Sequence, residues 1–327
     1  MIIGINGFGR FGLHLLKYWL DRSSETSFNI KYINDDYLSI DQVYKIILND
    51  SSVVFNKYKV RYVGDMLTFI EPNGLIHEIH FSNSSVDNIP WIGIPEMVFE
   101  CSGKNTSKDD CEFYVQGNTK RVLISATSWD ADSTLVYGFN HQEYKSSHRV
   151  ISYGSCTVNA FVPLADFINK KYVIKDSDVS VIHNIQHFRL KENQTLIRKF
   201  CTLEKSGPIL LDCINVNNFT VNYTVIPYSG VSMIDFRFQL ENISDKLKII
   251  DDLEYAFAKG DLKNLYGLDE ADIGPEVYNC STHSTVIIKE NIRVIGNNLY
   301  LPGYFDNENS VNRYYDLAEY IVCQEKV

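Results

Sequence analysis

The sequence predicts an α/β protein of two domains, the first built on a mostly parallel sheet and the second an α+β domain with an antiparallel sheet. Three observations support this fold class. The chain has 327 residues, about twice the size of a typical domain. In the first half, short apolar strands alternate with helical stretches, as in βαβ units. In the second half, long alternating strands follow one another with few crossovers.

Composition indicates an ordinary globular protein and argues against several partners. The chain is 45% hydrophobic and carries 31 Lys and Arg against 41 Asp and Glu, a net charge of −10. An acidic chain without long basic runs suits a nucleic-acid backbone poorly, so we expect no nucleic-acid partner. Because it has neither a long apolar run nor a basic leader, we expect no membrane association and a cytoplasmic location. Seven dispersed cysteines without a C-x-x-C suggest neither a disulfide framework nor a bound metal.

The first strand candidate, residues 1–5, runs into a glycine-rich turn. Gly7, Gly9 and Gly12 form a G-x-G-x-x-G pattern, and a helical repeat follows up to residue 21. A second strand over 28–33 ends just before Asp35, which lies 23 residues after Gly12. This strand–turn–helix–strand context predicts a Rossmann-type dinucleotide-binding domain. The alternative is a glycine-rich turn in a fold that binds no dinucleotide.

Each residue of this motif has a physical role in the prediction. Gly7 permits the tight turn, Gly9 lets the backbone approach the pyrophosphate, and Gly12 allows the helix to pack closely on the strand. Amide groups at the helix N-terminus would bind phosphate oxygens. Asp35 would accept hydrogen bonds from the adenosine ribose and repel a 2′-phosphate, so the predicted cofactor is NAD.

The remaining elements are expected from their periodicity. In the first half we expect helices over 39–48 and 107–116, and strands over 53–62, 66–70, 76–81, 97–101, 121–125, 135–137 and 150–152. In the second half we expect helices over 156–170, 244–259 and about 310–324, and strands over 179–187, 219–227, 231–240, 284–288 and 292–294.

A cysteine and a histidine are candidates for covalent catalysis. Cys156 stands where a strand gives way to a helix, and the positive end of a helix dipole stabilises a thiolate. His183 lies on a later strand, and a Cys–His pair brought together by folding is the basic arrangement of thiolate catalysis. On spacing alone, such residues are more often packing residues.

Four segments favour a catalytic role for this cysteine and histidine over a packing role. They are residues 5–12, 33–35, 155–159 and 305–308, the last followed by Asn312 and Arg313. They resemble the signature blocks of the glyceraldehyde-3-phosphate dehydrogenase family, in the family's order and at similar spacings, over essentially the whole chain. The resemblance implies a NAD-binding domain over 1–154, completed by a C-terminal helix at 307–327, and a catalytic domain over 155–306. It also implies a homo-oligomer, a tetramer as in the family, with a dimer as the alternative.

The resemblance also implies residue roles. Cys156 matches the nucleophile, and His183 matches the general base and thiolate partner. Ser155 and Thr157 match the substrate site. The cofactor positions outside the three glycines are Arg10, Phe11, Asp35, Ser102, Ser125 and Asn307.

The implied reaction is the NAD-dependent oxidation of an aldehyde, resembling conversion of glyceraldehyde 3-phosphate to 1,3-bisphosphoglycerate. The Cys156 thiolate would add to the aldehyde carbon while His183 handles the hydroxyl proton. Hydride transfer to nicotinamide would leave a thioester, which phosphate or water cleaves.

The substrate side departs from the family pattern. Val225 stands where the family has an arginine for the substrate phosphate, Gln186 replaces a threonine, and the threonine-glycine loop is reduced at best to Ser206-Gly207. The segment between His183 and Ser206, which in the family lies at a subunit boundary, is also short.

These departures leave alternatives open. In the first, another cation binds the phosphate, the candidates being Arg189, Arg198 and Arg237. Otherwise the aldehyde is a different one, or the protein is a non-catalytic NAD-binding or regulatory homologue. A semialdehyde dehydrogenase shares the two-domain plan and the Cys–His chemistry, but the four segments argue against it.

Overall fold

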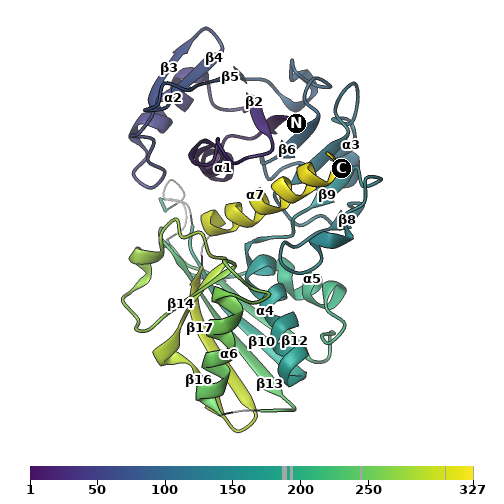
Figure 1. Cartoon of the computed structure of the whole chain (residues 1–327), viewed down its shortest axis with the longest axis vertical. Helices are drawn as coiled ribbons and strands as arrows, with labels where there is room; N and C mark the ends of the chain where they lie inside the picture. Colours follow the sequence, from purple (N-terminus) through teal and green to yellow (C-terminus); the bar gives the residue numbers. More distant parts are fainter. Residues whose placement is uncertain (186–189, 192–193, 244, 306, 327) are drawn as a thin grey trace. The chain divides into compact units, whose positions relative to one another are not determined.

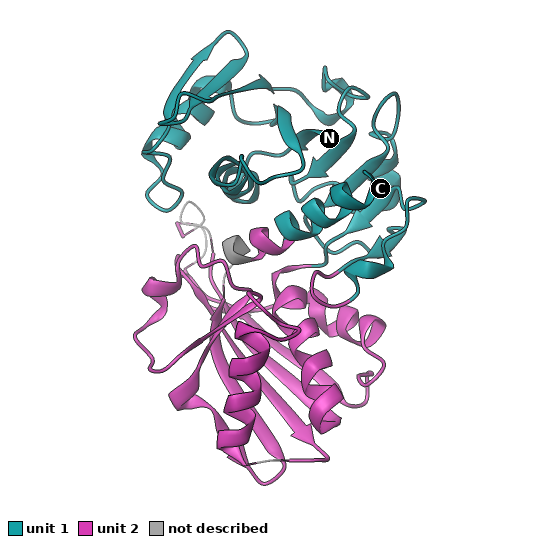
Figure 2. Cartoon of the chain, in the orientation of Figure 1, with its two compact units in different colours: residues 1–135, 140–154, 314–327 teal, residues 136–139, 155–313 magenta. Residues whose placement is uncertain are grey.

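The structure, a computed structural model, describes the chain except residues 186–189, 192–193, 244, 306 and 327, with only the backbone of 307–309. It confirms the α/β fold class. The chain forms two compact units (Figure 2). Unit 1 comprises residues 1–135, 140–154 and 314–327, and unit 2 comprises 136–139 and 155–313. None of the helices in the described part of the chain has the length and hydropathy of a membrane span.

The sheet of unit 1 has the strand order β3-β4-β5-β2-β1-β6-β7-β9-β8 (Figure 1). Neighbours from β5 to β8 are parallel, whereas β3, β4 and β5 form an antiparallel meander. The strands are β1 (Ile2–Asn6), β2 (Asn29–Asn34), β3 (Lys59–Val63), β4 (Met66–Ile70), β5 (Ile76–Ser82), β6 (Met97–Glu100), β7 (Arg121–Ile124), β8 (Ser133–Thr134) and β9 (Val150–Ser152). The helices are α1 (Arg10–Asp21), α2 (Ile40–Asn49), α3 (Lys108–Glu112) and, from Tyr314 onwards, α7 (Asn307–Gln324).

The order of this sheet reverses at β1, which has β2 on one side and β6 on the other. In open parallel sheets, ligands bind at such a switch point, beside the carboxyl ends of the strands. The loops that leave these ends carry Gly7 after β1, Asp35 after β2, Ser102 after β6 and Ser125 after β7. The topology therefore brings four of the predicted cofactor residues to one edge.

The sheet of unit 2 has the order β11-β12-β10-β13-β17-β15-β14, with β16 beside β17. Its strands are β10 (Ile174–His183), β11 (Ile197–Arg198), β12 (Phe219–Val225), β13 (Ser232–Leu240), β14 (Tyr266–Asp269), β15 (Thr285–Ile288), β16 (Arg293–Ile295) and β17 (Asn298–Phe305). The helices are α4 (Cys156–Tyr172), α5 (Thr202–Leu210) and α6 (Lys246–Ala258). Apolar residues of α4 and α6 pack with those of β10, β13 and β17 in one core. Short 3₁₀ turns lie at Val86–Asn88, His141–Glu143, Pro275–Tyr278 and Lys289–Asn291.

This second sheet is mixed, whereas the sequence predicted an antiparallel one. The pairs β10–β13, β13–β17 and β15–β17 are antiparallel, but β12 runs parallel to β10 and β14 runs parallel to β15. The reason for the first parallel pair is the connection between its strands. It contains α5, and a crossover of that length lets the chain return in the same direction.

Other differences from the predicted elements have local causes. The central strand β17 was not predicted, because Pro302 and Gly303 interrupt its pattern and proline is rare inside sheets. Helix α5 was missed for a similar reason, since it contains Gly207 and Pro208. The predicted strand over 53–62 is wrong before Lys59, where the chain forms turns. A predicted strand over 135–137 is replaced by β8, two residues earlier.

Helix α4 contains a proline whose missing hydrogen bond is replaced by a tyrosine. Pro163 has no amide hydrogen, so the carbonyl of Asn159 loses its helical donor. The hydroxyl of Tyr266 lies 2.9 Å from the carbonyl oxygen of Ala160 and 3.2 Å from that of Asn159, and accepts from the Leu164 amide at 3.1 Å. Because Tyr266 is only 2% exposed, no bulk water can take its place.

We expect Tyr266→Phe to lower the free energy of unfolding by about 1–3 kcal/mol, because it leaves buried backbone groups of α4 without partners. Urea titration followed by circular dichroism measures this change. The control is Tyr255→Phe on α6, a side chain that is 65% exposed, which we expect to change stability by less than about 0.5 kcal/mol. Equal effects of the two substitutions would show that the Tyr266 hydroxyl does not support the helix.

Candidate active site

A buried carboxylate joins the loops at the carboxyl edge of the unit 1 sheet. Glu100, the last residue of β6, is 1% exposed. Its Oε2 accepts from Nδ2 of Asn6 at 2.9 Å, the hydroxyl of Tyr114 at 2.7 Å and Nδ2 of Asn105 at 3.1 Å. Its Oε1 accepts from the amide of Ser102 at 2.8 Å and from the same residue's hydroxyl. Glu100 therefore fixes the loop that carries Ser102.

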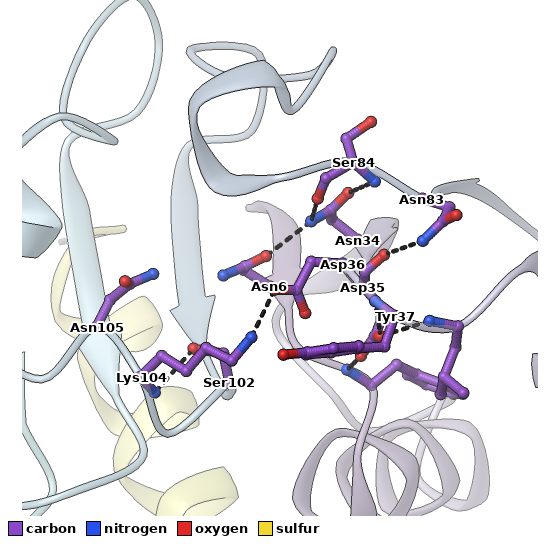
Figure 3. Close-up of polar contacts among 12 residues, drawn as sticks. Asn6, Asn34, Asp35, Asp36, Tyr37, Asn83, Ser84, Ser102, Lys104 and Asn105 are labelled. Atoms are coloured by element: carbon purple, nitrogen blue, oxygen red, sulfur yellow. Dashed lines mark hydrogen bonds and ion pairs between the residues drawn. The ribbon is translucent and has the colours of Figure 1, made fainter.

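The network continues across the sheet to β2. Asn6 and Asn34 are register partners, and Nδ2 of Asn34 donates to Oδ1 of Asn6 at 2.9 Å (Figure 3). Nδ2 of Asn34 also lies 3.0 Å from the carbonyl oxygen of Ser84. The ends of three parallel strands are thus joined by side-chain hydrogen bonds.

The glycine turn fits against this framework. Gly7 has φ +96°, and a Cβ there would lie 2.4 Å from the backbone nitrogen of Ser102. A Cβ on Gly12 would lie 2.3 Å from the carbonyl oxygen of Gly7, whereas one on Gly9 would meet no atom within 4 Å. Gly9 also begins α1 without a side-chain cap, so the first amides of the helix can donate to an anion. These are the features that a dinucleotide pyrophosphate requires.

Arg10 is held in place at the start of α1. Its guanidinium pairs with the carboxylate of Asp50, and its Nη2 lies 3.1 Å from Nε2 of His14. Burial, and then the positive charge of Arg10, lower the pKa of His14 to about 3. The ring is therefore neutral near pH 7 and can accept a hydrogen bond from Arg10.

The carboxylate of Asp35 accepts hydrogen bonds mainly from backbone amides. Its Oδ2 accepts from the amide of Phe8 at 2.7 Å, and its Oδ1 accepts from the amides of Tyr37 and Leu38, each at 2.9 Å. A carboxylate offers about four acceptor positions, so these three donors leave about one for a ribose hydroxyl. The side chain is 8% exposed. Asp35 thus ties the glycine turn to the end of β2.

The remaining predicted cofactor residues lie in different settings. The ring of Phe11 packs edge-on against the rings of Tyr153 and Tyr314, with centroids 5.8 and 5.2 Å away. The amide of Ser125 donates to the carbonyl of Glu100 at 2.9 Å. Asn307 is the first residue of α7, and its side chain lies outside the described part of the structure.

In unit 2, Cys156 is the first residue of α4. Ser155 caps this helix, because its side chain accepts from the amide of Val158 at 3.3 Å. A thiol in the first turn feels the positive end of the helix dipole, which favours its thiolate form.

His183 approaches this thiol from the end of β10. Its Nε2 lies 3.9 Å from Sγ of Cys156, and its Nδ1 lies 2.8 Å from the carbonyl oxygen of Asn184. Since a carbonyl can only accept, Nδ1 carries a proton, and Nε2 of the neutral ring is left to take the thiol proton. The ring is 7% exposed and lies against Tyr223 and Phe305, with centroids 5.4 and 5.8 Å away.

A second helix begins at the same place. The hydroxyl of Thr202, the first residue of α5, donates to Oγ of Ser155 at 3.1 Å. Oγ1 of Thr157 lies 3.2 Å from Oγ of Ser155 and 3.5 Å from Sγ of Cys201, the N-cap residue just before α5. Hydroxyl groups and two helix N-termini therefore meet beside Cys156, an arrangement that can bind an anion.

Thr202 was missed in the sequence, where Ser206 and Gly207 were taken as the remnant of the family's threonine-glycine loop. That assignment is wrong, because both residues are buried inside α5. The available signal was a threonine directly before a helical stretch, and the glycine and proline within α5 obscured it.

The strand next to His183 presents an apolar surface. In the sheet register, Val225 of β12 lies opposite His183, and Ile197 of β11 lies opposite Val225. Side chains opposite one another share a face, so both lie on the side of the sheet that His183 occupies. The position expected for the phosphate-binding arginine is therefore beside His183, and it carries valine.

Two of the three proposed replacement cations, Arg198 and Arg237, do not share that face. Arg237 donates to the carboxylates of Asp176 and Asp178, and its register partner is Asp178, on the face opposite His183. Arg198 lies opposite Thr224, also on the opposite face. Arg189 and Gln186 lie outside the described residues.

Comparison with known proteins agrees with this geometry. Residues 1–108 match the family model described as the glyceraldehyde 3-phosphate dehydrogenase NAD binding domain. The chain is 28% identical to glyceraldehyde-3-phosphate dehydrogenase 1 of Bacillus cereus, 27% identical to glyceraldehyde-3-phosphate dehydrogenase 4 of Caenorhabditis elegans and 27% identical to the cytosolic glyceraldehyde-3-phosphate dehydrogenase of Pisum sativum. Each alignment covers 98% of both chains.

The chain is thus similar to glyceraldehyde-3-phosphate dehydrogenases over nearly its whole length, at 27–28% identity. Its cofactor is NAD, since the matched segment is the family's NAD-binding domain and the glycine turn and the uncapped start of α1 fit a pyrophosphate. The resemblance read from the sequence is thereby confirmed. The departures from the family pattern lie at Val225 and in the segment before α5.

We expect iodoacetamide at pH 7 to alkylate Cys156 at least about ten times faster than it alkylates Cys323, because a helix N-terminus and His183 favour the thiolate of Cys156. Cys323 is exposed and serves as the internal reference, whereas burial raises the pKa of the Cys101, Cys111 and Cys201 thiols. Mass spectrometry of the labelled peptides gives the rates.

His183→Gln is the matched variant for this experiment, because it removes the base and keeps a polar side chain of similar length. It should slow labelling of Cys156 and leave that of Cys323 unchanged. Equal rates at the two cysteines in the unaltered protein would contradict an activated thiol.

Proposed function

We propose that this protein oxidises an aldehyde with NAD through a thioester on Cys156. The observation that carries the proposal is the pairing of Cys156 Sγ with His183 Nε2 at 3.9 Å, at the N-terminus of a capped helix. Unit 1 would bind the cofactor, with α7 contributing from its C-terminal part, and unit 2 would carry the reacting residues. The reaction resembles the conversion of glyceraldehyde 3-phosphate to 1,3-bisphosphoglycerate.

His183 and Cys156 divide the chemistry between them. Nε2 takes the thiol proton, the thiolate forms a bond to the aldehyde carbon, and the imidazolium returns the proton to the carbonyl oxygen. The neutral ring then removes this hydroxyl proton as the carbon gives up its hydride, and Cys156 holds the product as a thioester. NAD, when bound, supplies the hydride acceptor. In the last step, the C–S bond breaks and the thiolate leaves.

Inorganic phosphate is the proposed acceptor of the acyl group. The hydroxyl groups of Ser155, Thr157 and Thr202 lie within one hydrogen-bonded cluster at the starts of α4 and α5. Hydroxyls and helix N-termini bind phosphate oxygens, so this cluster supports attack by phosphate in preference to water.

With glyceraldehyde 3-phosphate, NAD and phosphate, we expect NADH formation that depends on phosphate and falls by about 10³ or more in Cys156→Ser, because the covalent step is lost. His183→Gln should lower kcat by about 10²–10⁴, the usual contribution of a general base. Absorbance at 340 nm follows the reaction. Failure to turn over in protein that still binds NAD would contradict the proposal and favour a non-catalytic, NAD-binding role.

A second candidate is oxidation of an aldehyde that carries no phosphate at this position. Val225 and Ile197 support it, since they place apolar side chains beside His183. Losing the arginine removes a charge-assisted contact to a dianion, which is among the stronger polar contacts.

Val225→Arg tests this candidate directly, because it restores the family residue beside His183. We expect it to raise kcat/KM for glyceraldehyde 3-phosphate about tenfold relative to glyceraldehyde, through a new contact with the phosphate. Val225→Gln is the control, because it adds bulk and polarity without charge. A protein that already prefers the phosphorylated aldehyde strongly, and gains nothing from the arginine, would rule the second candidate out.

We also propose a homo-oligomer, a tetramer by relation to the family. Leu196, Phe200 and Ile209 are each more than 60% exposed, as expected of apolar side chains that another subunit covers. Sedimentation velocity would separate a tetramer from a dimer or monomer. The name of the Pisum sativum relative includes the word cytosolic, which supports a cytoplasmic location here.

A further inference from the structure

An ion pair crosses the loops at the carboxyl edge of the unit 1 sheet. Nζ of Lys104, in the loop after β6, lies 2.5 Å from Oδ2 of Asp36, in the loop after β2. The same ammonium lies 4.2 Å from the ring centroid of Tyr37. Figure 3 shows Lys104 reaching from its own loop toward these two residues.

The pair lies where the adenosine half of the cofactor is recognised. In dinucleotide-binding domains, the acidic residue at the end of the second strand contacts the ribose 2′-hydroxyl, and a 2′-phosphate in NADP takes that region. Here that residue is Asp35, and Asp36 follows it directly. The loops after β2 and β6 flank the glycine turn of β1, so Lys104 and Asp36 meet beside the ribose position.

The neighbouring carboxylates of Asp35 and Asp36 differ in how freely they can move. Asp35 is buried and accepts from three backbone amides, so it has little freedom to move. The side chain of Asp36 is 39% exposed and that of Lys104 is 48% exposed. Asp36 raises the pKa of Lys104, which keeps the ammonium charged. Exposed ion pairs contribute little to stability, so Lys104 could change partners at small cost.

A 2′-phosphate here would meet one group that attracts it and one group that repels it. The ammonium of Lys104 is suited to bind it, whereas the carboxylate of Asp36 repels it and already engages that ammonium. Removing the charge of Asp36 would therefore both abolish the repulsion and release the Lys104 ammonium, and each change favours a phosphate. Removing Lys104 alone would change little, because that lysine is already paired with Asp36.

We propose that Asp36 is a specificity residue that selects NAD over NADP by withholding Lys104 from a 2′-phosphate. The inference depends on the cofactor alone and not on the proposed aldehyde chemistry. Its failure and the failure of the proposed function can therefore be distinguished, because the test measures binding without substrate.

Isothermal titration calorimetry of the full chain with NAD and with NADP tests the proposal. We expect Asp36→Asn to lower the Kd for NADP about tenfold while the Kd for NAD stays within about threefold, because the lysine gains a dianionic partner. Adding Lys104→Met to Asp36→Asn should reverse most of the gain. Lys104→Met alone should leave both Kd values within about threefold of the unaltered protein, since exposed ion pairs contribute little.

Asp41→Asn is the matched control, because it removes the same charge from another exposed pair, Asp41 with Lys45, in the same unit. It should leave the preference between the two cofactors unchanged. An unaltered NADP Kd in Asp36→Asn, a gain that persists without Lys104, or an equal gain in Asp41→Asn would each overturn the proposal. Loss of NAD binding in Asp36→Asn would also overturn it, because Asp36 would then be maintaining the loop and not choosing the cofactor.

Discussion

The cofactor edge of unit 1 depends on one buried carboxylate. Burying a charged group is costly unless hydrogen bonds satisfy it, and Glu100 is satisfied by donors from β1, from its own loop and from Tyr114. Because these donors come from separate segments, none of the segments can shift without leaving the carboxylate short of a partner. The tight turn at Gly7 follows from this constraint, since it must pass within contact distance of the Ser102 backbone that Glu100 holds.

The chemistry of unit 2 is likewise set largely by backbone groups. The thiol of Cys156 lies at a helix start that Ser155 caps, and Tyr266 supports the same helix where Pro163 interrupts its hydrogen bonds. The proton on His183 is held by a carbonyl oxygen, that of Asn184. A carbonyl fixes the tautomer without adding negative charge beside the ring. Nε2 is thereby directed at the thiol by local geometry.

The sequence was sufficient to predict the glycine turn and the helix start at Cys156, because each is encoded locally. The glycine spacing requires a close turn before a helix, and Ser155 next to Cys156 marks a helix start. Strand β17 could not be predicted, because Pro302 lies within it and its stability there comes from pairing with distant strands, among them β13, β15 and β16. The ion pair between Lys104 and Asp36 could not be predicted either, since the two residues are 68 positions apart in the sequence. The strand order of the sheet brings their loops together.

The carboxyl edge of the unit 1 sheet and the surroundings of His183 in unit 2 therefore differ in how readily a sequence can change them. The glycine turn of unit 1 depends on backbone amides, glycines and a buried network, so a substitution at one of these positions disturbs several partners at once. The position beside His183 belongs to a single side chain, Val225, on a strand near the sheet edge and only partly buried. Val225 is not among the residues of the core that α4 and β10 share, so a change there would alter the charge beside His183 more than the packing. A chain can thus keep the glycine turn and the Cys156–His183 pair while the residue beside His183 changes.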